Sequence, residues 1–129
     1  MAAAQERLGA AAGRVRWLCA DITQVELDTA GVELWHDRAC FHFLTGTAER
    51  AAYRRQLLRA VKSGGHVILS EFALSGPPRC SGLEVVRYDV DGLQRELGSA
   101  FRRLETRVEA HHTPAGQVQT FTCAAFVRR

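Results

Sequence analysis

The sequence lacks the features that mark several classes of protein. Four cysteines occur among its 129 residues, and they form no Cys-x-x-Cys pair. This argues against a zinc knuckle or a disulfide scaffold and favours reduced thiols. No apolar run approaches the length of a membrane-spanning helix, and the N-terminal residues lack the apolar segment of a secretory signal. We therefore expect a cytoplasmic protein with no membrane partner and no metal site.

A strong excess of charge is also absent. The chain has 17 Lys and Arg residues and 14 Asp and Glu residues, which gives a formal net charge of +3. The only basic cluster, Arg54 and Arg55 with Arg59, falls within an expected helix and has no interleaved aromatic residues for base stacking. We interpret it as a solvated helix face and expect no nucleic-acid partner.

The 11 glycines are spaced so that no Gly-x-Gly occurs anywhere in the chain. A complete nucleotide-binding fingerprint is therefore missing, because such glycines let the backbone approach the phosphates or the cofactor closely. With 47% hydrophobic residues, the chain is able to form the small core of one domain or of part of one.

What the sequence does contain is an alternation of apolar runs and helical segments. In chain order, we expect a helix at Ala2–Ala12, strands at Val15–Ala20 and Val32–Trp35, a helix at Thr47–Val61, a strand at His66–Leu74, a helix at Asp89–Leu97, and strands at Arg102–His111 and Val118–Val127. This order predicts an α/β fold with a Rossmann-like, mostly parallel sheet and helices on both faces. The last two strands flank the turn Thr113–Gly116 and predict a C-terminal antiparallel hairpin.

Polar side chains follow two of these strands directly. His36 and Asp37 come after the strand Val32–Trp35, and Asp21 follows the strand Val15–Ala20. Because parallel strands share one carboxyl edge, we expect the three side chains to face a common cleft. A histidine there would suit general-base chemistry near neutral pH. The alternative is that both aspartates cap the turns that follow them and that His36 orients the backbone.

Several motifs carry a resemblance to a known family. They are Trp35–Ala39 with Phe41–Leu44, Cys80–Leu83, Arg87-Tyr88, and His111–Pro114 with Gln119 and Phe121. Over nearly the whole chain, they resemble the C-terminal two-thirds of a class I S-adenosylmethionine-dependent methyltransferase, in a bacterial subfamily whose acceptor is mostly unassigned. The resemblance implies transfer of a methyl group from S-adenosylmethionine to an unidentified small-molecule or protein acceptor.

The resemblance also implies roles for particular residues. Asp21 and Ile22 match the loop that contacts the adenine of the cofactor, while His36 and Asp37 match the catalytic cleft. The glycine-rich loop and the acid that binds the ribose would precede Met1. We therefore interpret residues 1–129 as a single partial, truncated methyltransferase domain, incomplete at the N-terminus.

Two other functions remain open. The chain is either a non-catalytic methyltransferase-like remnant that acts as a binding or interaction module, or a Rossmann-like module for another nucleotide. In each case a strand without a neighbour would leave an open sheet edge, which favours formation of a homo-oligomer.

Overall fold

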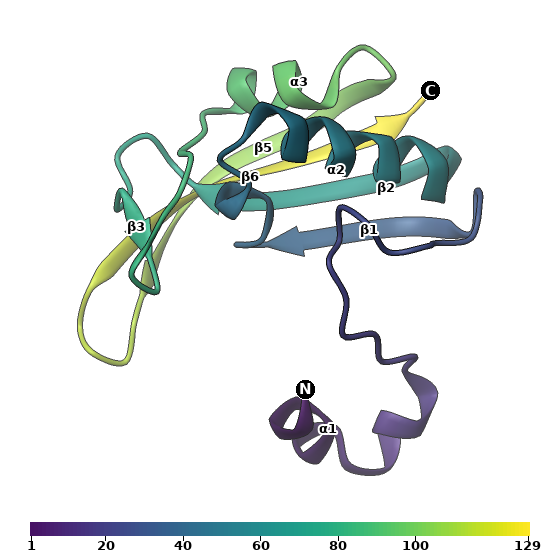
Figure 1. Ribbon diagram of the computed structural model, residues 1–129. Coiled ribbons are helices and arrows are strands. Elements are labelled where there is room, and N and C mark those ends of the chain that lie inside the picture. Colours follow the sequence, from purple (N-terminus) through teal and green to yellow (C-terminus); the bar gives the residue numbers. More distant parts are fainter.

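A four-stranded sheet forms the centre of the structure, a computed structural model that describes residues 1–129 (Figure 1). The spatial order of its strands is β1-β2-β6-β5. Their bounds are Val32–Arg38 for β1, Val61–Phe72 for β2, Val118–Arg128 for β6 and Phe101–His112 for β5. A separate two-stranded ladder joins β3 (Arg79–Cys80) to β4 (Leu83–Glu84) within the loop after β2.

The α/β fold and the C-terminal antiparallel hairpin are confirmed, but the sheet is mixed rather than mostly parallel. β1 and β2 run parallel, with Asp37 opposite Leu69. β6 is antiparallel to both of its neighbours, β2 and β5. One neighbouring pair of three is therefore parallel. The strand expected at Val15–Ala20 does not form.

The segment Val15–Ala20 is neither helix nor strand, and its side chains are largely exposed. It pairs with no strand of the sheet. Its apolar residues have the composition of a strand, but a strand exists only through backbone hydrogen bonds to a neighbour. The expectation of a strand here was wrong for this reason.

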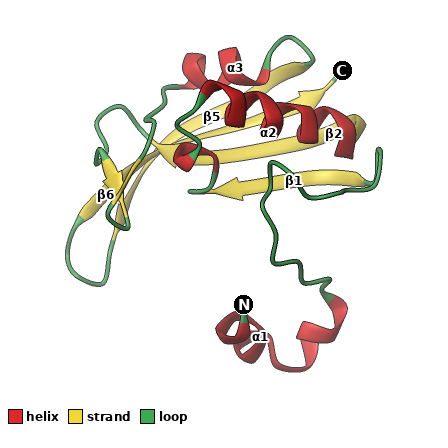
Figure 2. Cartoon of the chain, in the orientation of Figure 1, coloured by secondary structure: helices red, strands yellow, loops and turns green.

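Two helices, α2 (Thr47–Ala60) and α3 (Val90–Leu97), pack on the same face of the sheet, so the expectation of helices on both faces was also wrong. Their residues join strand residues in one core: Phe41, Tyr53, Leu57, Val61, Val67, Leu69, Tyr88, Leu93, Leu97, Phe101, Ala124 and Phe126. At the N-terminus, α1 (Ala2–Leu8) and the 3₁₀ turn η1 (Gly9–Arg14) have no buried residue and lie apart from the sheet (Figure 2).

Local sequence signals explain where the elements begin and end. Asp89 caps α3, since its side chain accepts a hydrogen bond from the Gly92 amide at 2.7 Å. Gly98 follows α3 with a φ of 81°, a conformation that favours glycine. In the hairpin turn, the Thr113 amide donates to the Gln117 carbonyl at 2.8 Å. The expected α3 and hairpin are thus confirmed.

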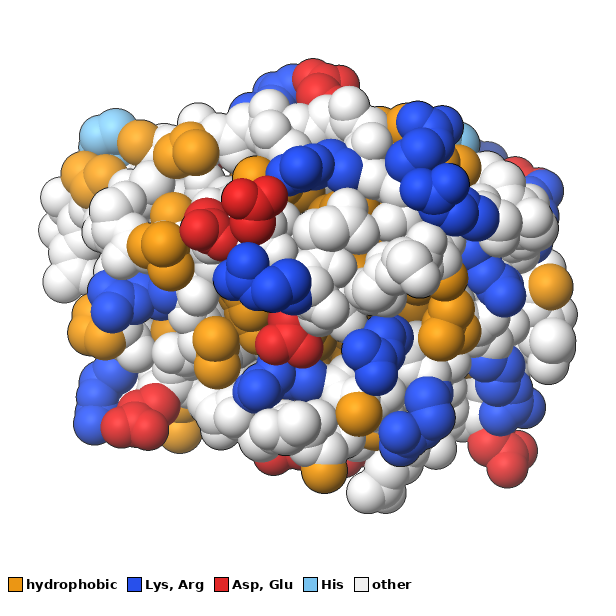
Figure 3. Space-filling view, turned by 90° about the horizontal axis from the view of Figure 1, so that it is seen from above, with side chains coloured by type: hydrophobic (Ala, Val, Ile, Leu, Met, Phe, Trp, Pro, Cys, Tyr) orange, Lys and Arg blue, Asp and Glu red, His pale blue; other side chains and the backbone are white.

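Acidic and basic side chains are interspersed on the face that Figure 3 shows, as the scattered charges of the sequence predict. No helix in the structure combines the length and the apolar character needed to cross a membrane.

Candidate functional site

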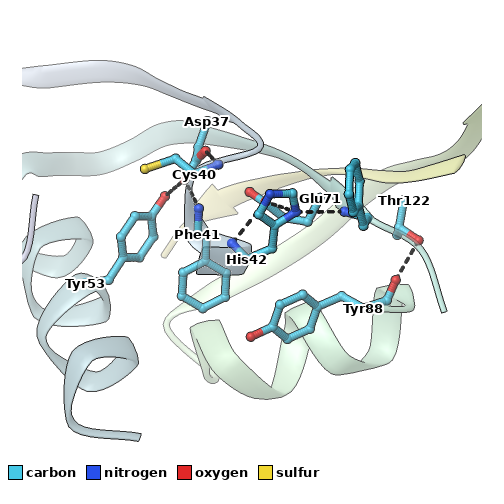
Figure 4. Close-up of polar contacts among 9 residues, drawn as sticks. Asp37, Cys40, Phe41, His42, Tyr53, Glu71, Tyr88 and Thr122 are labelled. Carbon is cyan, nitrogen blue, oxygen red and sulfur yellow. Dashed lines mark hydrogen bonds and ion pairs between the residues drawn. The ribbon is translucent and has the colours of Figure 1, made fainter. Parts of the chain in front are cut away.

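The carboxyl end of β1 leads into a tight turn that Asp37 holds. Its Oδ1 accepts a hydrogen bond from the Cys40 amide at 3.0 Å, and its Oδ2 accepts one from the Phe41 amide at 3.1 Å. The Tyr53 hydroxyl, from α2, also donates to Oδ2 at 2.5 Å. Asp37 is only 6% exposed. Its carboxylate therefore binds the backbone amides at the start of the 3₁₀ turn η2 (Phe41–Phe43), as Figure 4 shows.

A second carboxyl, Glu71 at the end of β2, holds the same turn. Glu71 Oε2 accepts a hydrogen bond from the His42 amide at 3.1 Å and lies 3.4 Å from His42 Nδ1. His42 Nδ1 in turn accepts a hydrogen bond from the Phe72 amide at 3.2 Å. Glu71 and His42 are both fully buried. Neighbouring parallel strands thus bring two carboxyl groups to one turn.

Burial determines the charges of these groups. It raises the pKa of Glu71 to about 9, with the negative charge of Asp37 as a further cause, so Glu71 is protonated at neutral pH. Burial lowers the pKa of His42 to about 4, so its imidazole is neutral there. Burial also raises the pKa of Asp37, although hydrogen bonds from Tyr53 and from the Cys40 and Phe41 amides act against this shift.

His36 points to the other face of the sheet. Adjacent residues of a strand project to opposite faces, and His36 pairs with Ile68 whereas Asp37 pairs with the core residue Leu69. His36 is exposed. Together with Arg38 of β1 and with residues of β2, β5 and β6, it lines a hollow of about 360 Å³. The two side chains expected to act together therefore lie on opposite faces of β1.

A second hollow, of about 540 Å³, runs along β1, an edge strand of the sheet, so residues from both faces of the strand line it. Ile22 and Trp35 line it together with His36 and Asp37. Asp21 is not among its lining residues.

Asp21 is exposed and caps its own turn. Its Oδ1 accepts hydrogen bonds from the Thr23 amide at 2.8 Å and from the Thr23 hydroxyl at 2.7 Å. These hydrogen bonds lower the pKa of Asp21 below its usual value. The carboxylate is therefore ionised at neutral pH, and its other oxygen has no partner within the chain.

Three polar residues at this site were not predicted from the sequence: His42, Tyr53 and Glu71. Glu71 is a single acid inside an apolar strand, and His42 lies between two phenylalanines, so both carried a signal of buried polarity. Tyr53 carried none, because a tyrosine on the inner face of a helix is ordinary core. No group of three His, Cys, Asp or Glu side chains that could hold a metal ion is found, and all four cysteines are free.

Comparison with known proteins identifies the fold. No protein-family model and no curated protein sequence matches the chain. Among solved structures, it is similar to a Burkholderia thailandensis 1,6-didemethyltoxoflavin N1-methyltransferase crystallised with 1,6-didemethyltoxoflavin and S-adenosylhomocysteine. The TM-score is 0.70 at 17% sequence identity, over 99% of this chain and 56% of that one. The chain has a class I S-adenosylmethionine-dependent methyltransferase fold.

Two further structures have the same arrangement. An S-adenosylmethionine-dependent methyltransferase from Methanosarcina mazei gives a TM-score of 0.68 at 14% identity, over 84% of this chain and 65% of that one. The [4+2]-cyclase SpnF also gives 0.68, at 15% identity, over 98% of this chain and 60% of that one. The chain therefore spans between 56% and 65% of the length of these three similar chains.

Proposed function

We propose that the chain is part of an S-adenosylmethionine-dependent methyltransferase that acts on a small-molecule or protein acceptor. The observation that carries the proposal is the likeness of nearly the whole chain to an enzyme crystallised with S-adenosylhomocysteine. The motifs around Trp35–Ala39 support it, because they lie at the carboxyl edge of β1, where open α/β sheets bind ligands. The fold alone does not fix the reaction, since a [4+2]-cyclase shares it.

The residues present fit one end of the cofactor. The hollow beside β1 is mostly apolar, and Ile22 and Trp35 contribute apolar side chains suited to contact with an adenine ring. Asp21, the neighbour of Ile22, does not line this hollow, but its free carboxylate oxygen is able to accept a hydrogen bond from an amino group. Without a Gly-x-Gly loop, nothing in the chain is suited to the methionine end, where the cofactor carries the methyl group to be transferred.

His36 and Asp37 then have different roles. His36 is exposed at the end of β1, so its imidazole is available to accept a proton from an acceptor group. Asp37 is buried and holds the turn after β1 through its bonds to Cys40 and Phe41. We propose His36 as the general base and Asp37 as the residue that positions the turn.

The first test is calorimetric titration of the 129-residue chain with S-adenosylmethionine. We expect weak binding or none, because each missing hydrogen bond to a charged group removes roughly 1–3 kcal/mol, and several such losses lower affinity by orders of magnitude. Stoichiometric binding with a micromolar Kd would show that the residues present suffice.

The second test uses the reading frame upstream of Met1. If it encodes a glycine-rich segment, a chain extended through that segment should bind the cofactor and transfer its labelled methyl group to candidate acceptors. His36→Asn in the extended chain should lower kcat and leave cofactor binding intact. An extended chain that folds but binds no cofactor would favour the alternative, a non-catalytic binding or interaction module.

A further inference from the structure

Two buried carboxyl groups share one short turn. The amides of Cys40, Phe41 and His42 are consecutive, and all three donate to Asp37 or Glu71. Asp37 comes from β1 and Glu71 from β2, so this set of contacts ties the turn to both parallel strands. We call Asp37 and Glu71 the carboxyl clamp.

No cation balances the carboxyl clamp. Neither carboxyl group forms an ion pair with a lysine or an arginine. The nearest basic group is His42, but its Nδ1 accepts the Phe72 amide and so carries no proton. His42 Nε2 and Glu71 Oε1 are both buried without a partner. Two buried carboxylates without a counter-charge repel each other strongly, so one of them keeps its proton.

The hydrogen bonds indicate which carboxyl keeps the proton. Asp37 accepts three hydrogen bonds, one of them from Tyr53, and these stabilise a negative charge on it. Glu71 accepts one hydrogen bond, from the His42 amide, and is the more deeply buried of the two. The charge therefore resides on Asp37 and the proton on Glu71.

We propose that the carboxyl clamp is a proton-dependent latch: with one proton it holds the turn Cys40–His42 closed, and loss of that proton opens the turn. The proposal does not depend on the function proposed above. Opening of the turn would change the shape of the hollow beside β1, because Asp37 and Cys40 line that hollow.

The other titratable groups around Glu71 change charge outside the range from pH 7 to about pH 10. The pKa of His42 is lowered to about 4, and that of Cys40 is raised by burial to about 11. Burial raises the pKa values of Tyr53 and Tyr88, so both phenols stay protonated in that range. Burial also raises the pKa of Asp37, and the hydrogen bonds that Asp37 accepts act against this shift. From β6, the residue opposite Glu71 is the uncharged Thr122. A transition near pH 9 is therefore assigned to Glu71.

Trp35 is hydrogen-bonded to the carboxyl clamp through Tyr53, so its fluorescence is a probe of the clamp. Its Nε1 donates to the Tyr53 hydroxyl at 2.9 Å, and this hydroxyl donates to Asp37. The chain has one other tryptophan, Trp17, in the exposed N-terminal segment. In a Trp17→Phe variant, the fluorescence of Trp35 should show one transition with a midpoint near pH 9.

Two further variants assign this transition. Glu71→Gln, which has no proton to lose, should abolish it. Glu33→Gln is the matched control, because Glu33 lies on β1, the strand of Trp35, but is exposed and paired with Lys62. It should leave the transition unchanged. A transition that persists in Glu71→Gln, or none in the parent, would overturn the proposal.

The pH dependence of the free energy of unfolding tests the latch even if Glu71→Gln fails to fold. The pKa of Glu71 rises from 4.5 to about 9 on folding, so between these values the unfolded chain has lost a proton that the folded chain keeps. Stability is therefore lost as pH rises, and from pH 7 to 9 the folding equilibrium constant should fall about tenfold per pH unit. His42 contributes only below its usual pKa of 6.5. A constant stability from pH 7 to 9 would contradict the latch.

Discussion

The two faces of the sheet belong to the same strands but have opposite environments. On β2, Leu69 is fully buried beneath the helices, whereas its neighbour Ile68 lies partly exposed on the face without helices. On β1, Asp37 is buried in the carboxyl clamp while His36 is exposed. One position along a strand thus separates residues that hold the fold from residues that are free to meet a ligand or a partner.

The largest expected effect on stability comes from replacing neighbouring residues of β2, one on each face of the sheet. Leu69→Ala should lower the free energy of unfolding by about 2–5 kcal/mol, because it leaves a cavity in the core. Ile68→Ala should lower it by less than half as much, since its side chain is already partly in water. Urea unfolding of both variants measures the difference. Equal losses would mean that the open face is covered in solution, and sedimentation would then show a homo-oligomer.

A second pair of variants compares two buried tyrosines on the covered face. Tyr53→Phe removes the hydrogen bond to the charged Asp37 and leaves Trp35 Nε1 without its acceptor, so it should destabilise the fold by about 1.5–3 kcal/mol. Tyr88→Phe is the matched control, because the buried Tyr88 hydroxyl has no partner. Because it breaks no hydrogen bond, it should change stability by less than Tyr53→Phe does. Similar losses in both variants would assign the effect to packing rather than to the carboxyl clamp.

The smallest effect is expected at the exposed residue of β1. His36→Asn should change the free energy of unfolding by less than about 0.5 kcal/mol, as is usual for surface substitutions. The same replacement one residue later, Asp37→Asn, should cost about 1–3 kcal/mol, because an amide group replaces an acceptor of three hydrogen bonds. Thermal unfolding of the two variants checks this, and a large loss at His36 would show that it has a structural role.

Much of the fold could be predicted from local patterns. The helix α3 follows from its cap at Asp89 and its stop at Gly98, and the hairpin follows from the turn Thr113–Gly116. These signals lie within a few residues of the structure that they specify. The number of strands and the covering of the faces could not be predicted in the same way, because both depend on neighbours far along the chain. Val15–Ala20 has the composition of a strand but no partner.

The site was predictable only in part, for a similar reason. The polar cluster after Trp35 indicated the carboxyl end of the strand, but β1 includes this cluster and ends at Arg38 rather than at Trp35. The alternation of a strand itself places His36 and Asp37 on opposite faces. The contact of Asp37 with Tyr53 joins residues 16 positions apart, and that of His42 with Glu71 joins residues 29 apart. The first pair depends on how α2 packs on the sheet and the second on how β1 pairs with β2, and the sequence pattern specifies neither.

The N-terminal segment that holds α1 and η1 should be the part of the chain that proteases cleave first. The elements α1 and η1 bury no residue, and the first residue to pack on the core is Ile22, whose carbonyl accepts a hydrogen bond from Gln56 Nε2 at 3.0 Å. Arg14 and Arg16 are exposed just before it. Limited trypsin digestion should therefore remove this leading segment first and leave a resistant fragment that keeps the entire sheet.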